Sequence, residues 1–396
     1  MACSCGHGPK MALKAYIIAG EQSGDQLGAH LIDGLKQLSP DIQLSGVGGT
    51  LMAKRGFQSL FEMSELSVMG LTEVLPKLPG LLRRIKETAN DILEQKPDVL
   101  ITIDSPDFCL RVAKKVKAET PDIKVVHYVA PSVWAWRPHR AEKMSRHVDH
   151  VLALLPFEPP YMEAAGMTCD FVGHPVASQK EIDSEKIATF RADLGIDSDA
   201  PLLCLLPGSR KGEVARHSAV FLNVIKRLSA EIPNLQVVLP AAPAVFEMVN
   251  VVFSGLDNVT VLDPSQSSEQ EKFAAFAASD FALAVSGTVS LELASQNTPM
   301  VIAYDAAPIT KMIMKRAFLL DTATLVNIVS ETHAVPEFIF DDFTTEKILP
   351  ALLGLLDDQV ARDAQQNAAR KTMQLLGRGE EPAGLRAARS VLEVIQ

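Results

Sequence analysis

The sequence predicts an α/β protein built from two doubly wound, Rossmann-like domains. Short apolar runs rich in β-branched residues alternate with longer helical patterns, which is typical of parallel sheets covered by helices. The 396 residues leave room for two or three domains of about 150 residues each. Hydrophobic residues make up 47% and charged residues 22% of the chain, so wholesale disorder is excluded.

The expected strands fall into two groups, which a polar segment at residues 173–201 separates. This segment contains a short helix at most, and it places the hinge near residues 173–176. From Thr345 onward the pattern is helical, so we expect the chain to end in helices. The expected strands are residues 16–19, 44–47, 99–104, 125–129 and 151–155 in the first half, and 202–206, 236–239, 259–262, 281–285 and 300–304 in the second.

Charge and composition narrow the class of protein. The net charge of −10 argues against nonspecific binding of nucleic acid. No apolar run approaches the about 20 residues of a membrane-spanning helix, and the N-terminus, MACSCGHGPKM, lacks a signal-peptide stretch. We therefore expect a cytoplasmic protein. Cys3, Cys5 and His7 offer too few ligands for a structural zinc site, so we expect no metal there.

The first strand ends in the sequence AGEQSGD, where Gly20 and Gly24 flank Glu21 and Ser23. Ligands of doubly wound sheets bind beyond the carboxyl ends of the strands, and glycines there let backbone N–H groups approach a polar ligand. The stretch does not match G-x-G-x-x-G, which disfavours a dinucleotide site. An ordinary tight turn is the alternative interpretation.

The third strand ends at Asp104, within the sequence IDSPDF. Ser105 is expected to cap the following helix, Pro106 suits its first position, and Asp107 lies where the helix dipole favours a carboxylate. Asp107 therefore has a sufficient structural role. Asp104 has none, because a carboxylate at the end of a buried strand is costly unless it is used. We interpret Asp104 as the candidate general base.

Aromatic residues follow the fourth strand in the sequence HYVAPSVWAWRP. Trp134 and Trp136 could stack on a sugar or line an apolar slot, and core packing is an equal alternative. His174, near the hinge, is more typical of a structural histidine than of a functional one.

The second half contains signals for a nucleoside diphosphate. Arg210 follows Gly208 and Ser209 in the sequence LPGSR, and a guanidinium on such a loop suits phosphate oxygens. A second turn before a helix, Ser286-Gly287-Thr288, offers backbone N–H groups to an anion. Glu292, one turn further on, can accept hydrogen bonds from ribose hydroxyls. Together these signals predict a nucleotide site.

Residues 67–84 carry an apolar stripe next to basic residues. The stripe is typical either of a core-facing helix or of a surface that meets a membrane or acyl chains. Pro76 and Pro79 would break a regular buried helix, so the second interpretation stands as an equal alternative to the first. The stripe consists of Val68, Leu71, Leu75, Leu78 and Leu82.

These motifs resemble those of the lipid-A-disaccharide synthase family of inverting glycosyltransferases. The matching stretches are AGEQSGDQLGA, GVGG, ELSVMGLTEVLPKLP, IDSPDF, HYVAPSVWAWRP, LLPFE, FVGHP, LLPGSRKGEV and SGTVSLE, in order from about residue 14 to about residue 345. The resemblance implies a GT-B fold of two domains that face a cleft. Residues 11–172 would bind the acceptor and 173–365 the UDP-sugar, and the C-terminal helix, about 366–396, would pack back on the first domain.

The resemblance also implies a reaction and its residues. The enzyme would transfer 2,3-diacylglucosamine from UDP-2,3-diacylglucosamine to the 6-hydroxyl of 2,3-diacylglucosamine 1-phosphate (lipid X), giving a β-1,6 disaccharide and UDP. Asp104 would be the base, and Glu21, the second residue of the catalytic site, would contact the acceptor or donor sugar. The donor would contact Gly208, Ser209, Arg210, Ser286, Gly287, Thr288, Glu292 and Asn327. The acceptor lipid or the membrane would contact Ser23, Gly24, Val68, Met69, Leu71, Leu75, Trp134 and Trp136.

The family pattern brings further expectations. No metal or other cofactor is expected, because arginine and helix N-termini can stabilise the leaving UDP. Peripheral association with the cytoplasmic face of the inner membrane is expected, and a homodimer is left open. Two departures stand out: Thr324-Leu325-Val326-Asn327 replaces Ser-Leu-Pro-Asn, and Asp305 replaces an arginine.

Three other classes of protein share parts of this pattern. A UDP-sugar epimerase could have the same two domains and UDP site, but it needs no acyl-binding stripe. A two-domain ligand-binding protein usually acts outside the cytoplasm, which the missing signal peptide disfavours. An NAD-dependent dehydrogenase is disfavoured by the missing glycine motif.

Overall fold

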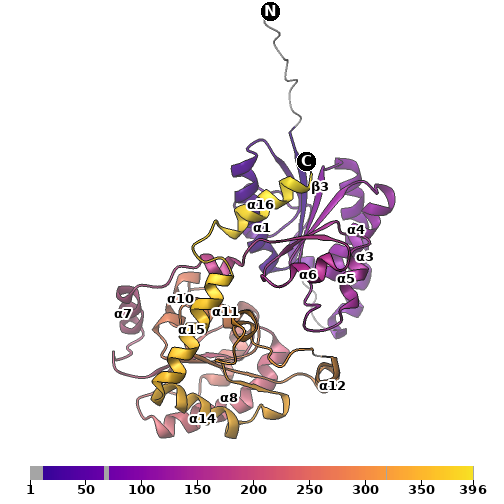
Figure 1. The fold of residues 1–396 in the computed structure, drawn as a ribbon. Helices are drawn as coiled ribbons and strands as arrows, with labels where there is room; N and C mark the ends of the chain where they lie inside the picture. Colours follow the sequence, from indigo (N-terminus) through magenta and orange to yellow (C-terminus); the bar gives the residue numbers. More distant parts are fainter. Residues whose placement is uncertain (1–11, 67–70, 318, 396) are drawn as a thin grey trace, which may run out of the picture. The chain divides into compact units, whose positions relative to one another are not determined.

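The structure of the chain is a computed structural model that describes residues 12–66, 71–317 and 319–395. It divides into two compact units, one made of Met1–Pro175 with Glu380–Gln396 and the other of Val176–Gly379. The first division therefore falls within the segment expected to be the hinge. The fold is of the GT-B type, and each unit has its own doubly wound sheet (Figure 1).

The first unit is built on a six-stranded sheet whose neighbouring strands all run parallel among the described residues. Buried β-branched and leucine side chains fill its central strands, as covering by helices on both faces requires. In sheet order the strands are β2 (Gln43–Val47), β1 (Lys14–Ala19), β3 (Val99–Ile103), β4 (Lys124–Tyr128), β5 (His150–Ala153) and β6 (Thr168–Phe171).

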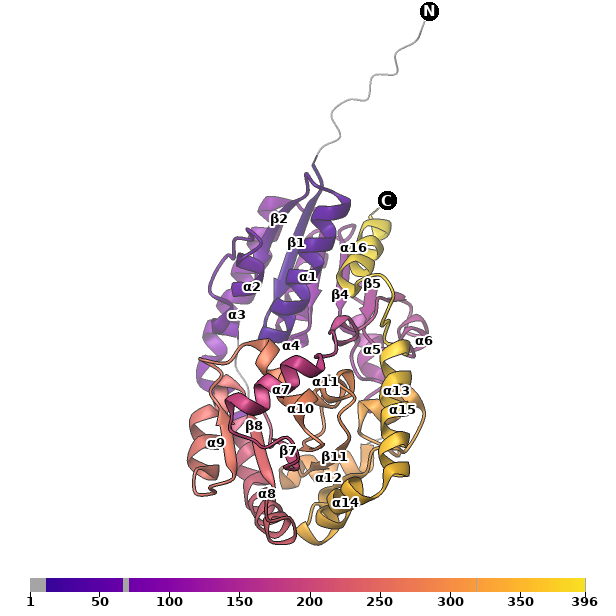
Figure 2. The ribbon, with the colours of Figure 1, turned by 90° about the vertical axis from the view of Figure 1, so that its left-hand side faces the viewer.

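Helices cover both faces of this sheet. One face packs on α1 and α16, and the other packs on α3, α4, α5 and α6 (Figure 2). The helices are α1 (Gln22–Leu38), α2 (Thr50–Ala53), α3 (Leu71–Gln95), α4 (Pro106–Glu119), α5 (His139–Met144), α6 (Pro159–Glu163) and α16 (Ala383–Val394), with 3₁₀ turns at η1 (Met63–Leu66) and η2 (Pro175–Ser178).

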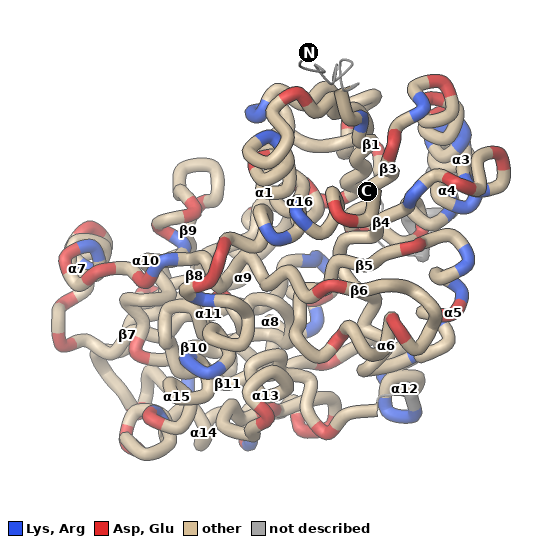
Figure 3. Tube along the Cα trace, turned by 45° about the horizontal axis from the view of Figure 1, so that its top comes forward, with Lys and Arg blue, Asp and Glu red and all other residues tan. Residues whose placement is uncertain are grey.

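Helix α3 runs through Pro76 and Pro79, so the expectation that these prolines break the helix is wrong. Pro79 and Gly80 are exposed. Basic and acidic residues both occur along α3 (Figure 3). Arg84 pairs with Glu65 at 2.5 Å and with Glu87 at 2.7 Å.

Helix α16 packs so closely on α1 that the contact leaves no room for a Cβ atom at Gly34 and Gly384. A Cβ atom on Gly384 would stand 2.4 Å from the carbonyl oxygen of His30, and one on Gly34 would stand 2.5 Å from that of Gly384. The Ser390 hydroxyl contacts His150 Nε2 at 2.8 Å and donates to Asp170 at 2.7 Å. These contacts attach α16 to α1 and to strands β5 and β6.

The segment that returns to the first unit is shorter than expected. It begins at Glu380 rather than near residue 366, because α15 (Gln359–Leu375) packs on α11 and α13 of the second unit. The expected boundary at 365/366 is therefore corrected to 379/380.

The second unit has a sheet of the Rossmann type, again six-stranded and parallel within the described residues. In sheet order its strands are β12 (Glu337–Ile339), β11 (Met300–Tyr304), β10 (Phe281–Ala284), β7 (Leu202–Leu206), β8 (Gln236–Pro240) and β9 (Val259–Leu262). Its helices are α7 (Ser184–Asp193), α8 (Lys211–Glu231), α9 (Phe246–Phe253), α10 (Glu269–Ala278), α11 (Val289–Ser295), α12 (Pro308–Ala317), α13 (Leu325–Ser330), α14 (Thr345–Asp357) and α15, with η3 (Pro243–Val245) and η4 (Phe340–Asp342).

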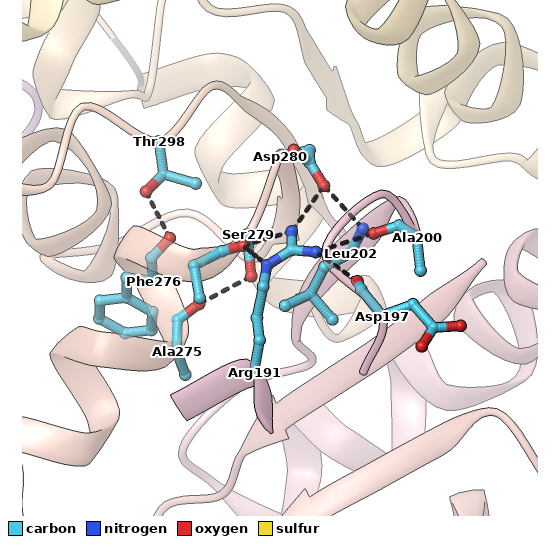
Figure 4. A network of polar contacts seen from close by, with 10 residues as sticks. Arg191, Asp197, Ala200, Leu202, Ala275, Phe276, Ser279, Asp280 and Thr298 are labelled. Carbon is cyan, nitrogen blue, oxygen red and sulfur yellow. Dashed lines mark hydrogen bonds and ion pairs between the residues drawn. The ribbon is translucent and has the colours of Figure 1, made fainter. Parts of the chain in front are cut away.

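One arginine fastens α7, the helix of the polar segment, to this sheet. Figure 4 shows Arg191 donating to the carbonyl oxygens of Asp197 and Ala200 and pairing with Asp280 at 3.0 Å. Asp280 also accepts the N–H of Leu202, the first residue of β7, at 2.8 Å. The polar segment is thereby held at the start of the strand that carries the LPGSR loop.

Candidate functional site

The order of strands in the first unit reverses between β1 and β3, so their carboxyl ends flank a topological switch point. Ala19 and Ile103 are partners in the ladder, and the chain leaves them at Gly20 and Asp104. Open α/β sheets bind ligands at such a point. The structure therefore brings the AGEQSGD and IDSPDF motifs to one edge.

Asp104 is held in a strained turn at this edge. Both Asp104 (φ +50°) and Ser105 (φ +42°) adopt the left-handed conformation, which is rare for residues other than glycine. The Asp104 N–H donates to the carbonyl oxygen of Tyr128 at 3.0 Å, which fixes the turn to β4. Burial raises the pKa of the half-buried Asp104 carboxyl, while a backbone hydrogen bond from Ser105 partly lowers it. A base with a raised pKa suits abstraction of a hydroxyl proton.

Ser105 precedes α4, but its side chain makes no capping hydrogen bond with any described residue. The left-handed turn instead places it against the β1 end, where a Cβ atom on Gly20 would stand 2.4 Å from the Ser105 hydroxyl. The prediction that Ser105 caps the helix through its side chain is wrong for this reason. Gly20 is required here because the two strand ends approach so closely.

Glu21 and Asp104 follow the ends of neighbouring strands, because Ala19 of β1 pairs with Ile103 of β3. The charges of both carboxylates contribute to the raised pKa of Cys109, although burial is the main cause. Glu21 occupies the N-cap position of α1, and its carbonyl oxygen accepts the N–H of Asp25 at 2.9 Å. The two predicted catalytic carboxylates therefore share one edge of the sheet.

Asp25 has a structural role. Its buried carboxylate accepts the N–H groups of Gly49, Leu51 and Met52 at 2.8–3.1 Å, so it caps α2 from α1. A Cβ atom on Gly49 would stand 2.6 Å from this carboxylate, which explains the glycine in the GVGG motif.

Ser23 and Gly24 differ in exposure, although both were predicted to contact acceptor or lipid. Ser23 is exposed, whereas Gly24 is buried against Ala19 and Ile103. A Cβ atom on Gly24 would meet these neighbours at 3.5 Å, an ordinary contact. Gly24 therefore packs α1 on the sheet.

The two tryptophans have different environments. Trp134 is buried, its ring meets Phe157 edge to face at 5.1 Å, and its indole N–H donates to Glu158 at 3.1 Å. Core packing thus accounts for Trp134. Trp136 is half-buried with the Arg137 guanidinium 4.3 Å above its ring, and it remains the aromatic candidate for a ligand contact.

The second unit has its own switch point between β7 and β10. The N–H of Val285 donates to the carbonyl oxygen of Leu206 at 3.1 Å, so the LPGSR loop and the turn at residues 286–288 start side by side. The structure therefore joins the two segments predicted to bind a nucleoside diphosphate.

Glu213 shapes the LPGSR loop. Its carboxylate accepts the N–H of Ser209 at 3.2 Å and lies 3.4 Å from Arg210. Gly208 has φ +126°, and a Cβ atom on it would stand 2.7 Å from that of Glu213, so other residues are strained here. The Arg210 side chain is 62% exposed and its ion pair is weak, which leaves the guanidinium able to turn toward an anion.

Glu292 is paired across two helices. Its carboxylate on α11 lies 2.7 Å from the ammonium group of Lys272 on α10. In the preceding turn the Ser286 hydroxyl donates to the carbonyl oxygen of Ala323 at 3.0 Å, Gly287 has φ +157° and Thr288 is the N-cap of α11. Lys272 thus holds Glu292 in place beside the turn.

Asn327 is buried and its hydrogen bonds go to protein atoms. Its amide donates to Val335 at 2.9 Å and to Glu337 at 3.1 Å, and its oxygen accepts the N–H of Val335 at 3.0 Å. Glu337 also accepts the N–H of Ala323 at 2.9 Å, and Ala323 in turn binds Ser286. Asn327 therefore supports the Ser286 turn from behind.

The predicted lipid or membrane contacts cannot be placed in the same detail. Val68 and Met69 lie outside the described residues, and so do the side chains of Leu71 and Leu75 on α3. Leu82, seven residues beyond Leu75 on the same stripe, is 49% exposed.

No helix in residues 12–66, 71–317 or 319–395 is both long and apolar enough to cross a membrane. Nor do these residues contain a group of three or more His, Cys, Asp or Glu side chains arranged to hold a metal ion.

The sequence analysis did not identify three polar residues that support the carboxyl edges of the two sheets: Glu158, His217 and Lys272. Glu158 follows a buried strand, as Asp104 does, and the same argument could have found it. His217 interrupts the apolar face of α8 between Val214 and Phe221, which is a detectable signal. Lys272 has no comparable signal, because its partner lies on another helix.

A family model and curated relatives match nearly the whole chain. The model described as lipid-A-disaccharide synthetase matches residues 15–391. The lipid-A-disaccharide synthase of Ruegeria pomeroyi is 53% identical over 387 residues, covering 96% of this chain and 95% of that protein. That of Rhodospirillum centenum is 42% identical over 386 residues, covering 97% and 95%.

Solved structures of more distant proteins share the fold. The UDP-GlcNAc 2-epimerase from Neisseria meningitidis bound to UDP-GlcNAc has a TM-score of 0.67 at 14% identity, covering 96% of this chain and 99% of that one. The epimerase from Methanocaldococcus jannaschii in complex with UDP-GlcNAc and UDP has a TM-score of 0.61 at 14% identity, with the same coverage. At this identity the likeness concerns the fold alone.

Proposed function

The chain belongs to the lipid-A-disaccharide synthetase family, and from this membership we propose how its two units share the reaction. The protein is a UDP-sugar-dependent, inverting glycosyltransferase of lipid A biosynthesis. It transfers 2,3-diacylglucosamine from UDP-2,3-diacylglucosamine to the 6-hydroxyl of 2,3-diacylglucosamine 1-phosphate. The products are the β-1,6-linked disaccharide and UDP.

The first unit binds the acceptor, and Asp104 is the general base. The Asp104 carboxylate takes the proton of the 6-hydroxyl while that oxygen attacks the anomeric carbon of the donor. The bond between this carbon and the UDP oxygen breaks, and UDP leaves with the electron pair. One attack inverts the anomeric centre. The observation that carries this proposal is the strained turn that holds Asp104 at the β1–β3 switch point.

Glu21 and Trp136 complete the acceptor side of this proposal. The Glu21 carboxylate lies on the same edge as Asp104 and is suited to accept hydrogen bonds from sugar hydroxyls. Trp136 offers a half-buried aromatic face for a sugar or an acyl chain.

The second unit binds the UDP part of the donor at the β7–β10 switch point. Arg210 and the backbone of Gly208 and Ser209 contact the diphosphate, with the turn of Ser286, Gly287 and Thr288 beside them. Glu292 accepts hydrogen bonds from the ribose hydroxyls. Asn327 supports this turn rather than touching the donor, because protein atoms occupy its amide.

The reaction proceeds without a metal ion or other cofactor in this proposal. The guanidinium of Arg210 supplies the positive charge that the leaving UDP needs. A chelator such as EDTA should therefore leave the turnover rate unchanged, and a loss that added Mg²⁺ restores would contradict this part.

We propose that the protein associates peripherally with the cytoplasmic face of the inner membrane. Both substrates carry acyl chains and must be drawn from a bilayer, and the stripe from Val68 to Leu82 offers an apolar surface for this. Sedimentation of the purified chain tests the homodimer that the resemblance leaves open.

A turnover assay tests the reaction and the base together. Purified protein is incubated with UDP-2,3-diacylglucosamine, with and without 2,3-diacylglucosamine 1-phosphate, beside the Asp104→Ala variant. We expect acceptor-dependent UDP release that Asp104→Ala abolishes while UDP binding survives. Binding of UDP-sugar without acceptor-dependent turnover would instead favour the epimerase, which the fold likeness alone supports.

A further inference from the structure

A histidine that the reaction does not use links two loops at the edge of the second sheet. His217 on α8 is fully buried. Its Nδ1 lies 3.0 Å from the carbonyl oxygen of Pro207, the residue that opens the Gly208–Arg210 turn. Its Nε2 lies 3.1 Å from the backbone nitrogen and 3.0 Å from the carbonyl oxygen of Asp305, just beyond β11.

The chemistry of these partners assigns the proton. The backbone N–H of Asp305 can only donate, so Nε2, 3.1 Å away, accepts its hydrogen. In the neutral ring the hydrogen is then on Nδ1, which donates to the Pro207 carbonyl oxygen. One imidazole therefore binds the backbone of both loops at once.

Aromatic rings hold the imidazole in this orientation. Phe221 stacks on it at 6.0 Å, while Tyr304 and Phe343 lie 5.3 and 5.2 Å from it. These rings come from α8, β11 and the segment after η4. They exclude water from both hydrogen bonds, and rotating the ring would leave a buried backbone group unpaired.

Asp305 takes part through its backbone. Its side chain instead lies 3.4 Å from Lys311, which also pairs with Asp341 at 2.9 Å. The contact with His217 therefore needs no particular side chain at position 305. This fits a chain in which an aspartate stands where the family pattern has an arginine.

We propose that His217 is a positioning residue for the UDP site, which holds the Pro207–Arg210 loop in the conformation that binds the diphosphate. The inference rests on the proposed function, since it takes Arg210 and the loop backbone as diphosphate contacts. His217 itself is buried and touches no substrate. It acts by fixing the Pro207 carbonyl to the end of β11.

Two variants distinguish the hydrogen bond of Nδ1 from that of Nε2. In His217→Asn the amide nitrogen takes the place of Nδ1 and keeps the donor to Pro207. In His217→Gln the amide oxygen reaches the place of Nε2 and keeps accepting from Asp305, while the Pro207 bond is lost. We expect His217→Gln to raise the Kd for UDP about five- to tenfold, as the loss of one buried hydrogen bond would. His217→Asn should stay within about twofold of the wild type.

The measurements are UDP binding by calorimetry, the KM for the donor and kcat, with thermal unfolding of each variant as a check of folding. His217→Gln should raise the donor KM in step with Kd and leave the acceptor KM unchanged. Ser218→Ala is the matched control, because this neighbouring hydroxyl is also buried and donates within α8, to the carbonyl oxygen of Val214. It should leave UDP binding unchanged.

Two results would overturn the proposal. One is equal UDP affinity in His217→Gln and the wild type; the other is an equal loss in the Asn and Gln variants, which would indicate disturbed packing. Arg210→Ala is measured in parallel. If Arg210→Ala also binds UDP like the wild type, the placement of the UDP site is wrong. If Arg210→Ala loses UDP affinity and His217→Gln does not, the UDP site is supported and the positioning role of His217 is rejected.

Discussion

The indole N–H of Trp134 donates to the Glu158 carboxylate at 3.1 Å, and both side chains are buried. The same carboxylate accepts the N–H groups of Leu154 and Leu155 at 3.2 and 3.0 Å. Glu158 thereby fixes the PSVWAW loop to the end of β5. Burial raises the pKa of Glu158 to about 7 from its usual 4.5, although these three hydrogen bonds act in the opposite direction.

Glu158 makes the stability of the first unit depend on pH. Because its folded pKa is raised, its contribution to the free energy of unfolding is present below pH 4.5 and is lost as pH rises through about 7. Glu158→Gln should remove this slope between pH 4.5 and about 7. Urea unfolding followed by tryptophan fluorescence measures it, since both tryptophans of the chain lie in this unit.

The control for this experiment is Glu163→Gln, which changes an exposed carboxylate on the neighbouring helix α6. It should keep the slope of the wild type. An unchanged slope in Glu158→Gln would mean that this carboxyl group does not titrate in the range.

Replacing Asp104 with asparagine should lower kcat by about 10²–10⁴-fold, the usual contribution of a general base. UDP affinity should stay the same, because UDP binds to the other unit. In the wild type the acid limb of the pH–rate profile should lie above the usual range of an aspartate, because the pKa of Asp104 is raised by burial. Asp107→Asn, three residues along the same motif, should retain activity; equal loss in both variants would point to a damaged α4.

Arg210→Ala should raise the donor KM about tenfold or more with little loss of stability, because its ion pair with Glu213 is exposed and weak. Arg210→Lys should recover only part of the affinity, since an ammonium group cannot form two parallel bonds to phosphate oxygens. Steady-state kinetics with varied donor measures both. Arg227→Ala removes a similar exposed pair with Glu346 and should leave the donor KM unchanged.

Val68→Ser combined with Leu75→Ser should shift the protein from the vesicle fraction to the soluble fraction in a flotation assay with anionic lipid vesicles. The reason is that the apolar surface proposed to enter the bilayer becomes polar. The matched control is Val251→Ser with Val360→Ser, which alters two side chains of the second unit that are 77% and 78% exposed. Unchanged partition of the first double variant would rule out the proposed patch.

Gly384→Ala should lower the free energy of unfolding by about 1–3 kcal/mol, because the added Cβ atom meets the His30 carbonyl oxygen at 2.4 Å. Gly354→Ala is the comparison. This helical glycine has no described atom within 4 Å of an added Cβ, so alanine there should be neutral or stabilise by up to about 1 kcal/mol. Thermal unfolding of the two variants distinguishes a packing effect from a general effect of alanine.

The sequence was sufficient to predict the strands that have a clear apolar run. It did not predict β6 (Thr168–Phe171) or β12 (Glu337–Ile339), because both are short, lie at the edge of their sheet and keep partly exposed side chains. Strands of this kind bury too little to leave an apolar pattern. Tertiary contacts also decided the end of the second unit, where nothing in the sequence of α15 says which unit it joins.

The clearest site prediction comes from a polar residue that has no local explanation. Asp104 is such a case, because it ends a buried strand and neither capping nor solvation accounts for it. Asn327 and Trp134 were predicted to contact the donor and the acceptor lipid, but their polar groups bind protein atoms. Their partners, Glu337 and Glu158, come from other segments of the chain. The hydrogen bonds that satisfy a side chain depend on the fold, and a local motif does not show them.

The way α16 closes the first unit also affects how the chain is made. His150 pairs with a serine 240 residues later, so at about 5–20 residues per second the ribosome needs about 10–50 s to supply it. Throughout that time the face of α1 that α16 covers stays open to solvent and to other nascent chains. A chaperone that recognises apolar helices could bind this face of α1 during that time. A chain that ends before residue 380 would lack α16 and leave the same face uncovered permanently.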